Sequence, residues 1–538
     1  MSVGSAMMRG TSEGTGADMV EQAVRALVEA IVAEAPSGWA HAVMHGRIDR
    51  GDVTVTGGYT PRENPWDSRM PHPLVELMML GEALRQERGW ESVSVEVRCL
   101  PTGAYRFAAF DDSLTWVTGE GSGYQLVLDP DYRLPQPGAH QDPGTAAPAG
   151  DPELAVARFR TYLERRAAIL GHAEELPPPA TAAELDEAER RLGRRLPADL
   201  RALYAVADGD GDLGLFRGHA WVPLRRLVAE STGPYAVERP WFGWDLEWDG
   251  VVFDTTPADT VRRCGAHPGW LRFTTAYDGN YLAVDTVPAR DGRPGQVIHT
   301  GRDYDRGPSY VADSVTSLLG HYLDLLEQGA YEQRGDRIAL LGTGRESAPR
   351  DIVGGMPDEV PPSLQALHIN DAPDVVDLAP LTAAPRLRRL HLNRSTTGDL
   401  TPVRDLPVES LRVTLVDGDL APLAGHAHLT SLGLTTTAPT DLTPLRTVPH
   451  LRGLDLSGAD TPDLTALAGL PELRYLALTG RQWAALLDAG AVPPALAAAQ
   501  LADRDATLDD ALAWAARLGL DTANALHSAG THDSLDLK

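Results

Sequence analysis

Residues 387–403 read LRRLHLNRSTTGDLTPV, and the same pattern returns as LTSLGLTTTAPTDLTPL at residues 429–445 and as LRGLDLSGADTPDLTAL at residues 451–467. Each stretch has apolar residues at its first, fourth and sixth positions, and an Asp-Leu pair follows. Such triplets begin at six positions, Leu364, Leu387, Val408, Leu429, Leu451 and Leu473, at intervals of 23, 21, 21, 22 and 22 residues. Coincidence at so many registers is improbable, so this region is built from repeated units.

A period near 22 residues is typical of leucine-rich repeats, in which each unit gives one short parallel strand and a turn back. One unit cannot bury its leucines alone, but six stacked units form a continuous core. The Asp-Leu pairs, four of which continue as D-L-x-P-[L/V], are similar to the bacterial internalin-type repeat. That resemblance implies a short helical turn on the convex side. The residues expected to point into the solenoid core are Leu390, Leu392, Leu432, Leu434, Leu454 and Leu456.

One position in each repeat, between its last two apolar residues, should face the concave side of the solenoid. From the first repeat to the sixth, this column reads His368, His391, Arg412, Gly433, Asp455 and Ala477. Its first half is basic or protonatable and its second half is small or acidic. Because solenoids commonly use this face for partners, we predict that His368, His391, Arg412 and Asp455 contact a protein partner. The alternative is a merely solvated face.

The middle of the chain opens with clear helix boundaries. Thr181 and Glu184 form a capping box, Gly193 ends the first helix, and Pro197 starts the second. The order of residue types in 189–209 resembles the opening of a SUKH-superfamily domain of the Smi–Knr type. Later landmarks of that family follow in order: Trp270, the turn Asp278-Gly279-Asn280, a strand at 281–285, Gly295, and a closing helix from Ser314.

This resemblance covers roughly residues 155–331 and implies a small α+β domain. Domains of this kind are best known as immunity proteins in bacterial polymorphic-toxin systems, and other members are intracellular adaptors. The family offers no catalytic motif. The chain departs from the family pattern in a longer and more aromatic insert between Trp221 and Trp270.

Within that insert, residues 241–249 read WFGWDLEWD, so four aromatic side chains alternate with three carboxylates. Aromatic residues are enriched at binding hot spots, and carboxylates attract a basic surface. We therefore predict a partner-binding loop. The alternative is that the tryptophans fill the core of the domain. The predicted contacts are Trp241, Phe242, Trp244, Asp245, Glu247, Trp248 and Asp249.

The N-terminal part begins with an amphipathic helix from residue 18 to 35, followed by alternating strands and a second helix from 73 to 86. The order of these elements, with Trp39 and Trp90, is similar to the YezG-like immunity family. The predicted fold is multidomain: an α+β domain (18–134), a linker (135–150), the SUKH-like α+β domain (151–331), a linker (332–361), a leucine-rich-repeat solenoid of parallel strands (362–480) and a helical C-terminal cap (481–538).

Composition narrows the functional classes. The 538 residues carry a formal net charge of −27, which disfavours nucleic-acid and membrane-surface binding and would attract a basic protein. Only Cys99 and Cys264 are present, no secretory leader precedes residue 20, and no apolar run could span a membrane, so we expect a cytoplasmic protein.

Catalytic and metal-binding signatures are missing from the sequence. The acidic run Asp208-Gly209-Asp210-Gly211-Asp212 lacks the glycine and the terminal carboxylate of a calcium loop, so a solvated turn is expected. We predict no catalytic residue, no cofactor and no metal. The expected function is immunity, in which a basic toxin domain is neutralised by stoichiometric binding. The alternative is an intracellular regulatory scaffold that binds other proteins.

Overall fold

The computed structural model describes residues 16–49, 52–60, 72–111, 116–117, 123–129, 131–135, 138, 141–233, 250–304, 306–341, 350–503, 506–523 and 525–531. These residues form two compact units. One unit joins residues up to 132 with residues from 413 onward, and the other joins residues from 133 to 412. The boundary falls between residues 412 and 413, so the predicted repeats are divided between the two units.

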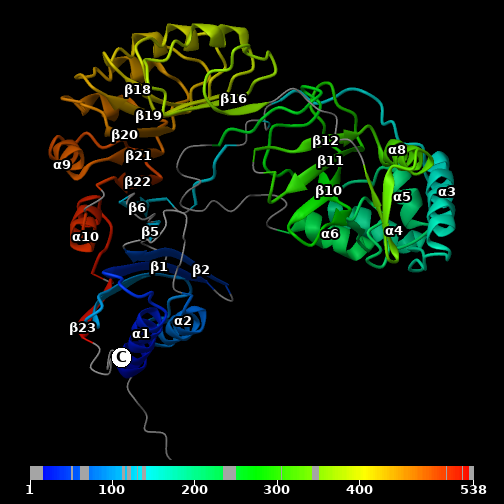
Figure 1. The fold of residues 1–538 in the computed structure, drawn as a ribbon, viewed down its shortest axis with the longest axis horizontal. Helices are drawn as coiled ribbons and strands as arrows, with labels where there is room; N and C mark the ends of the chain where they lie inside the picture. Colours follow the sequence, from blue (N-terminus) through cyan, green and yellow to red (C-terminus); the bar gives the residue numbers. More distant parts are fainter. Residues whose placement is uncertain are drawn as a thin grey trace, which may run out of the picture. The chain divides into compact units, whose positions relative to one another are not determined.

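The first unit contains an antiparallel sheet in the order β2-β1-β3-β4-β23, with α1 and α2 on one face (Figure 1). Strand alternation turns Met44 and Val95 toward the helices, where they meet Leu27 and Leu77 in one core. Leu77 is buried, whereas its neighbour Met78 is exposed. The elements are α1 (Gly16–Ala33), β1 (His41–Asp49), β2 (Asp52–Thr60), α2 (Leu74–Arg88), β3 (Val93–Cys99), β4 (Ala104–Phe110), β5 (Trp116–Val117) and β6 (Tyr124–Val127).

The C-terminal segment does more than cap the solenoid with helices. It holds α9 (Gly480–Asp488) and α10 (Leu508–Arg517), but also β22 (Ala498–Leu501) and β23 (Leu526–Thr531). Strand β23 pairs antiparallel with β4 and completes the N-terminal sheet. The prediction of a purely helical cap was therefore wrong. Ala499 of β22 occupies the position of a repeat leucine, opposite Leu476 of β21. Because alanine breaks the leucine pattern, the sequence analysis did not identify β22 as the strand of a seventh repeat.

The second unit contains the SUKH-like region, a sheet in the order β12-β11-β10-β8 with α3, α5 and α8 gathered on one side (Figure 1). The capping box at Thr181 and the left-handed Gly193 are both present, with a φ of 67° at Gly193. The elements are α3 (Pro152–Leu170), α4 (Ala182–Leu192), α5 (Ala198–Tyr204), β7 (Ala220–Trp221), α6 (Leu224–Thr232), β8 (Trp270–Arg272), β9 (Thr274–Thr275), β10 (Asn280–Asp285), β11 (Gln296–Gly301), β12 (Ser309–Ala312) and α8 (Val315–Glu327).

The stretch expected to be a linker after residue 331 contains the hairpin β13 (Tyr331–Arg334) and β14 (Arg337–Leu340). Ile338 and Leu340 are buried in the SUKH-like core. In β14 the buried Ile338 and Leu340 alternate with the less buried Arg337 and Ala339, a strand pattern that the prediction took for a linker of broken composition. The hairpin therefore belongs to the domain that precedes it.

A strand occurs at every predicted repeat, the pairs β16–β17, β19–β20 and β20–β21 are parallel, and all six leucines named above are at most 2% exposed. An additional strand, β15, precedes the first predicted repeat and pairs parallel with β16. The predicted strands and buried leucines of the repeats are therefore present, and β15 adds one strand before them. The strands are β15 (Asp351–Gly354), β16 (Ala366–Asn370), β17 (Arg389–Thr397), β18 (Ser410–Leu415), β19 (Ser431–Thr436), β20 (Gly453–Gly458) and β21 (Tyr475–Leu478).

The Asp-Leu pairs explain the short helical turns of the repeats. In each of five repeats, the aspartate carboxylate accepts a hydrogen bond from the backbone N–H two residues later, at 2.7–2.9 Å. This local bond caps a 3-10 turn, and the following leucine enters the core. The turns are η3 (Ala379–Ala383), η4 (Thr401–Val403), η5 (Ala421–Leu423), η6 (Thr443–Thr447) and η7 (Thr465–Gly469).

Candidate protein-binding surface

The aromatic and acidic loop, the first predicted partner-binding site, lies outside the described residues. This applies to Trp241, Phe242, Trp244, Asp245, Glu247, Trp248 and Asp249. Its role in binding a partner stays a prediction.

The predicted column of one residue per repeat, from His368 to Ala477, lies on the parallel strands of the repeats. In the second unit, His368 of β16 pairs with His391 of β17, and their rings meet edge to face at 5.1 Å. Arg412 of β18 is exposed. In the first unit, Asp455 of β20 pairs with Gly433 on one side and with Ala477 on the other. The structure therefore groups His368, His391 and Arg412 in one unit and places Asp455 in the other.

His391 does not behave as the protonatable surface residue that was predicted. It is 6% exposed, and its Nε2 lies 2.9 Å from the hydroxyl oxygen of Ser410. Burial, together with the nearby Arg412, Arg389 and His368, lowers the pKa of His391 to about 2. The imidazole is therefore neutral at physiological pH. The prediction failed because the repeat pattern gives the direction of a side chain and not the bulk of its neighbours.

The contact between Ser410 and His391 has the length of a nucleophile–base pair. Ser410 is fully buried, however, so no substrate carbonyl could reach its hydroxyl oxygen. A base with a pKa near 2 also accepts no proton at neutral pH. The pair packs two repeats together, and its geometry gives no support to hydrolytic chemistry.

The neutral His391 predicts how stability depends on pH. Below about pH 6.5 the imidazole binds a proton in the unfolded state but not in the folded state. Each further pH unit of acidification should therefore lower the free energy of unfolding by about 1.4 kcal/mol through this group. We expect His391→Gln to lose about 2 kcal/mol less stability than the parent between pH 6.5 and 5. Urea unfolding at several pH values measures this, and the difference at pH 8 sets the baseline for altered packing.

Burial also raises the pKa of Asp285 to about 6, and this acts in the opposite direction on acidification. Asp285 is identical in the two proteins compared, so its contribution cancels from the difference. Parallel stability curves for the parent and His391→Gln from pH 8 to pH 5 would contradict the prediction.

The SUKH-like domain covers part of the strand face through the segment that follows the aromatic loop. Phe253 and Val251 pack against Ala366 of β16, and the guanidinium of Arg389 lies 5.4 Å from the centroid of the Phe253 ring. The backbone of Asp254 exchanges two hydrogen bonds with the Gln365 amide, at 2.7 and 3.0 Å. The insert that sets this chain apart from the family pattern thus docks on the chain's own first repeats.

A three-residue charge cluster joins the same two parts. Arg263 donates to both carboxylate oxygens of Glu409 at 2.7 Å, and Arg388 donates to one of them at 2.7 Å. Arg263 also donates to the Val252 carbonyl. Both side chains of the Arg263–Glu409 pair are only 11% exposed. The SUKH-like domain is therefore in direct contact with the first repeats. This contact leaves less of the strand face of the repeats open to another protein than the repeat pattern suggested.

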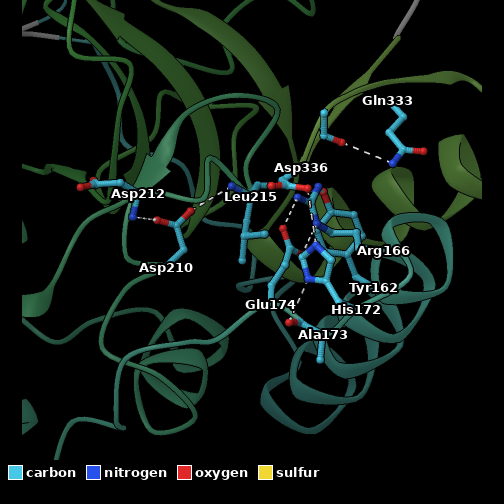
Figure 2. Close-up of polar contacts among 11 residues, drawn as sticks. Tyr162, Arg166, His172, Ala173, Glu174, Asp210, Asp212, Leu215, Gln333 and Asp336 are labelled. Atoms are coloured by element: carbon cyan, nitrogen blue, oxygen red, sulfur yellow. Dashed lines mark hydrogen bonds and ion pairs between the residues drawn. The ribbon is translucent and has the colours of Figure 1, made fainter.

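The acidic turn of the SUKH-like domain is a buried structural element and not the solvated turn that was expected. Asp210 is fully buried, and its carboxylate accepts hydrogen bonds from the backbone N–H groups of Asp212 at 3.1 Å and Leu215 at 2.9 Å (Figure 2). Burial raises the pKa of Asp210, and these N–H donors partly offset that effect. In the part of the chain that the structure describes, no group of three or more acidic, histidine or cysteine side chains is arranged for a metal ion.

A buried polar chain continues from this turn into α3. The hydroxyl of Tyr162 donates to the Leu215 carbonyl at 2.9 Å, and Arg166 donates to the Tyr162 oxygen at 3.3 Å (Figure 2). Arg166 also makes two hydrogen bonds of 2.7 Å to Glu174. These polar groups are buried and hydrogen-bonded to one another. They therefore hold the acidic turn in place and are not available for catalysis.

A second turn, between β9 and β10, presents an exposed aromatic side chain that contacts the acidic turn. Tyr277 has a φ of 64°, a left-handed conformation that is costly for a tyrosine, and its side chain is 61% exposed. Its hydroxyl donates to the Asp212 carboxylate, and the guanidinium of Arg226 lies 5.2 Å from its ring centroid. Asp212 and Arg217 in the facing loop also have positive φ values of 70° and 57°.

Strained backbone that holds a large side chain in solvent is typical of functional sites. Sequence reasoning found the turn at Asp278 but missed Tyr277, because no local residue pattern announces a left-handed tyrosine. Tyr277, supported by Asp212 and Arg226, is therefore the best-defined candidate contact residue in the described part of the SUKH-like domain.

Comparison with known proteins supports the identity of this domain. Residues 179–321 match the SMI1 / KNR4 family (SUKH-1). The chain therefore contains a SUKH-1 domain, and the predicted SUKH resemblance is confirmed. The likeness of the N-terminal domain to the YezG-like family stays a prediction.

Full-length relatives share only part of this chain. A glucan synthesis regulatory protein from Neurospora crassa is 42% identical over 29% of this chain and 34% of its own length. The cell wall assembly regulator SMI1 from Saccharomyces cerevisiae is 26% identical over 29% of this chain and 36% of its own length. The similarity thus spans about a third of these curated relatives.

Among solved structures, the chain is similar to an internalin C2 from Listeria monocytogenes, with 27% identity over 22% of this chain and 53% of the other and a TM-score of 0.21. The assignment of leucine-rich repeats rests on the strands and turns described above. In the described ranges, no helix combines the length and the apolarity needed to cross a bilayer.

Proposed function

We propose that this chain is a non-enzymatic regulatory scaffold, which binds other proteins through its SUKH-1 domain and through the open part of the repeat face. The observation that carries the proposal is Tyr277, an exposed aromatic residue held in a strained conformation by Asp212 and Arg226. Tyrosine and arginine are among the residue types that most often supply binding energy at protein interfaces.

The comparisons favour regulation over toxin immunity. The two relatives above are named as regulators of cell wall assembly and glucan synthesis. Immunity is supported only by the sequence resemblance of the SUKH-like and N-terminal domains. We therefore adopt the alternative of a regulatory scaffold. The proposed partner is an unidentified protein and no longer a basic toxin domain.

A single substitution tests this surface. Glycine adopts a φ of 64° without strain, so Tyr277→Gly should leave the melting temperature nearly unchanged. The same change should weaken a partner bound through the tyrosine by about 2 kcal/mol, which is about thirtyfold in affinity. The measurement is quantitative affinity capture with the full chain followed by mass spectrometry, and then titration of the captured protein.

Two further variants serve as controls. Tyr277→Phe keeps the ring beside Arg226 and should retain most of the affinity, whereas Val375→Ala changes an exposed residue of the repeats and should have no effect. If the captured partner binds Tyr277→Gly as tightly as it binds the parent, the surface around Tyr277 is not the binding site.

A further inference from the structure

The last strand of the chain forms one edge of the N-terminal sheet and is attached there by few side chains. Strand β23 pairs antiparallel with β4 over its full length, and among the described strands it pairs with no other. Four of its six residues are exposed, whereas Leu526 packs against the core that the sheet forms with α1 and α2. The backbone ladder to β4 is therefore the main attachment of β23, which places this strand among the less stable parts of the first unit.

The edge of β4 suits the sequence of β23. On the core side of the sheet, Leu526 lies opposite Ala109, whose small side chain leaves room for it. Two residues further on, the hydroxyl oxygen of Ser528 lies 3.3 Å from that of Tyr105. At Gly530, a Cβ atom would lie 3.1 Å from the ring of Tyr105, so a larger residue would crowd that ring. The edge therefore favours a strand with leucine, serine and glycine at alternate positions.

The connection to β23 is long enough for the strand to reach another molecule. Residues 518–525 join β23 to α10, in which Ala511 and Ala515 are fully buried. An extended connection of this length spans about 26 Å. Because β23 is the last strand of the chain, it can change its sheet while α10 stays in place.

We propose that the edge of β4 exchanges strands between two copies of this chain, so that β23 of each copy completes the N-terminal sheet of the other. A second copy is the partner that fits, because it carries the leucine, serine and glycine that the edge favours. Each contact between β23 and β4 is kept in such a pair, so the exchange changes mainly the entropy of the connecting segments. This proposal does not rest on the regulatory function proposed above.

A pair of cysteines distinguishes exchanged from resident strands. Arg106 and Ala529 are paired across β4 and β23, and both are exposed. In the full chain with Arg106→Cys and Ala529→Cys, the two sulfur atoms lie within reach of a disulfide. This disulfide links two chains where the strands are exchanged and stays within one chain where they are not. The native Cys99 and Cys264 are buried, so they should not react.

The experiment oxidises the double variant after overnight incubation at two protein concentrations and counts covalent dimers by denaturing electrophoresis without reductant. A short flexible connection holds its own strand at an effective concentration of about 1 mM. We therefore expect mostly single chains with an internal disulfide at about 10 µM, and about a third or more of the protein as linked dimers at about 1 mM. The internal disulfide at the lower concentration also shows that the variant folds with β23 on β4.

Two controls complete the test. Ala529→Cys alone measures the disulfides that form by random collision and should give few dimers at either concentration. The peptide acetyl-Ala-Leu-His-Ser-Ala-Gly-Thr-amide, which copies residues 525–531, should lower the yield of linked dimers when it is present in excess. Single chains alone at about 1 mM would overturn the proposal. If the peptide then still binds in ligand-observed NMR, the edge accepts a strand of another protein and the second copy is the wrong partner.

Discussion

Replacing Glu409 by alanine should destabilise the second unit by about 3–5 kcal/mol, because two largely buried arginines would lose the carboxylate that they share. Burial already lowers the pKa of Arg388, and the neighbouring Arg263 lowers it further, so this guanidinium lies in a poorly solvated place. Without Glu409 the two guanidinium groups would repel each other where water cannot screen them. The readout is urea unfolding together with hydrogen exchange of the amides in β17 and the segment 251–263.

Two comparisons separate the charge cluster from a general loss of contacts. Glu472→Ala removes a carboxylate that is 53% exposed and 3.6 Å from Arg474, and it should cost at most about 0.5 kcal/mol. The triple change Arg263→Met, Arg388→Met and Glu409→Leu replaces all three charges with apolar groups and should recover most of the lost stability. An unfolding curve for Glu409→Ala that overlays the parent curve would show that the cluster does not join the SUKH-1 domain to the repeats.

Leu454→Asp should destabilise the first unit by several kcal/mol. Leu454 is fully buried in β20, and neither neighbouring strand supplies a cation beside it, since Leu432 and Leu476 are its paired residues. A carboxylate there must lose its hydration or take up a proton, and both cost free energy. Thermal unfolding monitored by circular dichroism measures the loss.

The matched control for this change is Ala468→Asp, which puts the same side chain on an exposed residue of the next turn, η7. It should alter the melting temperature by no more than a degree or two. If Leu454→Asp melts with the parent, the repeat leucines do not form the core that their spacing predicts.

The parts of this fold that the sequence predicts well are those with a local cause. The period of the repeats, the aspartate before each turn and the capping box at Thr181 act within a few residues, and all three occur as expected. Strand β23 was missed because its partner β4 lies far away in sequence, and pairing over such a distance leaves no local pattern. The burial of His391 was missed because the repeat pattern gives the direction of its side chain and not the bulk of the groups around it.

The candidate site was less predictable than the fold. The exposure of Tyr277 depends on a left-handed backbone that is fixed by contacts with Asp212 and Arg226 from other loops and helices. The docking of Phe253 and Arg263 on the first repeats depends on two parts of the chain that the sequence describes as separate domains. Sequence patterns indicate which residues form an element, but they carry little information about which elements meet.

The pairing of β23 with β4 has a consequence for synthesis on the ribosome. Tyr105 and Ser528, which meet across these strands, lie 423 positions apart. At about 5–20 residues per second, the strand that covers β4 is made roughly 20–80 s after β4 itself. During that time the nascent N-terminal sheet has an open edge, and an open edge is a template for unwanted pairing. Slow translation of the repeats would lengthen the interval in which this edge of the sheet is open.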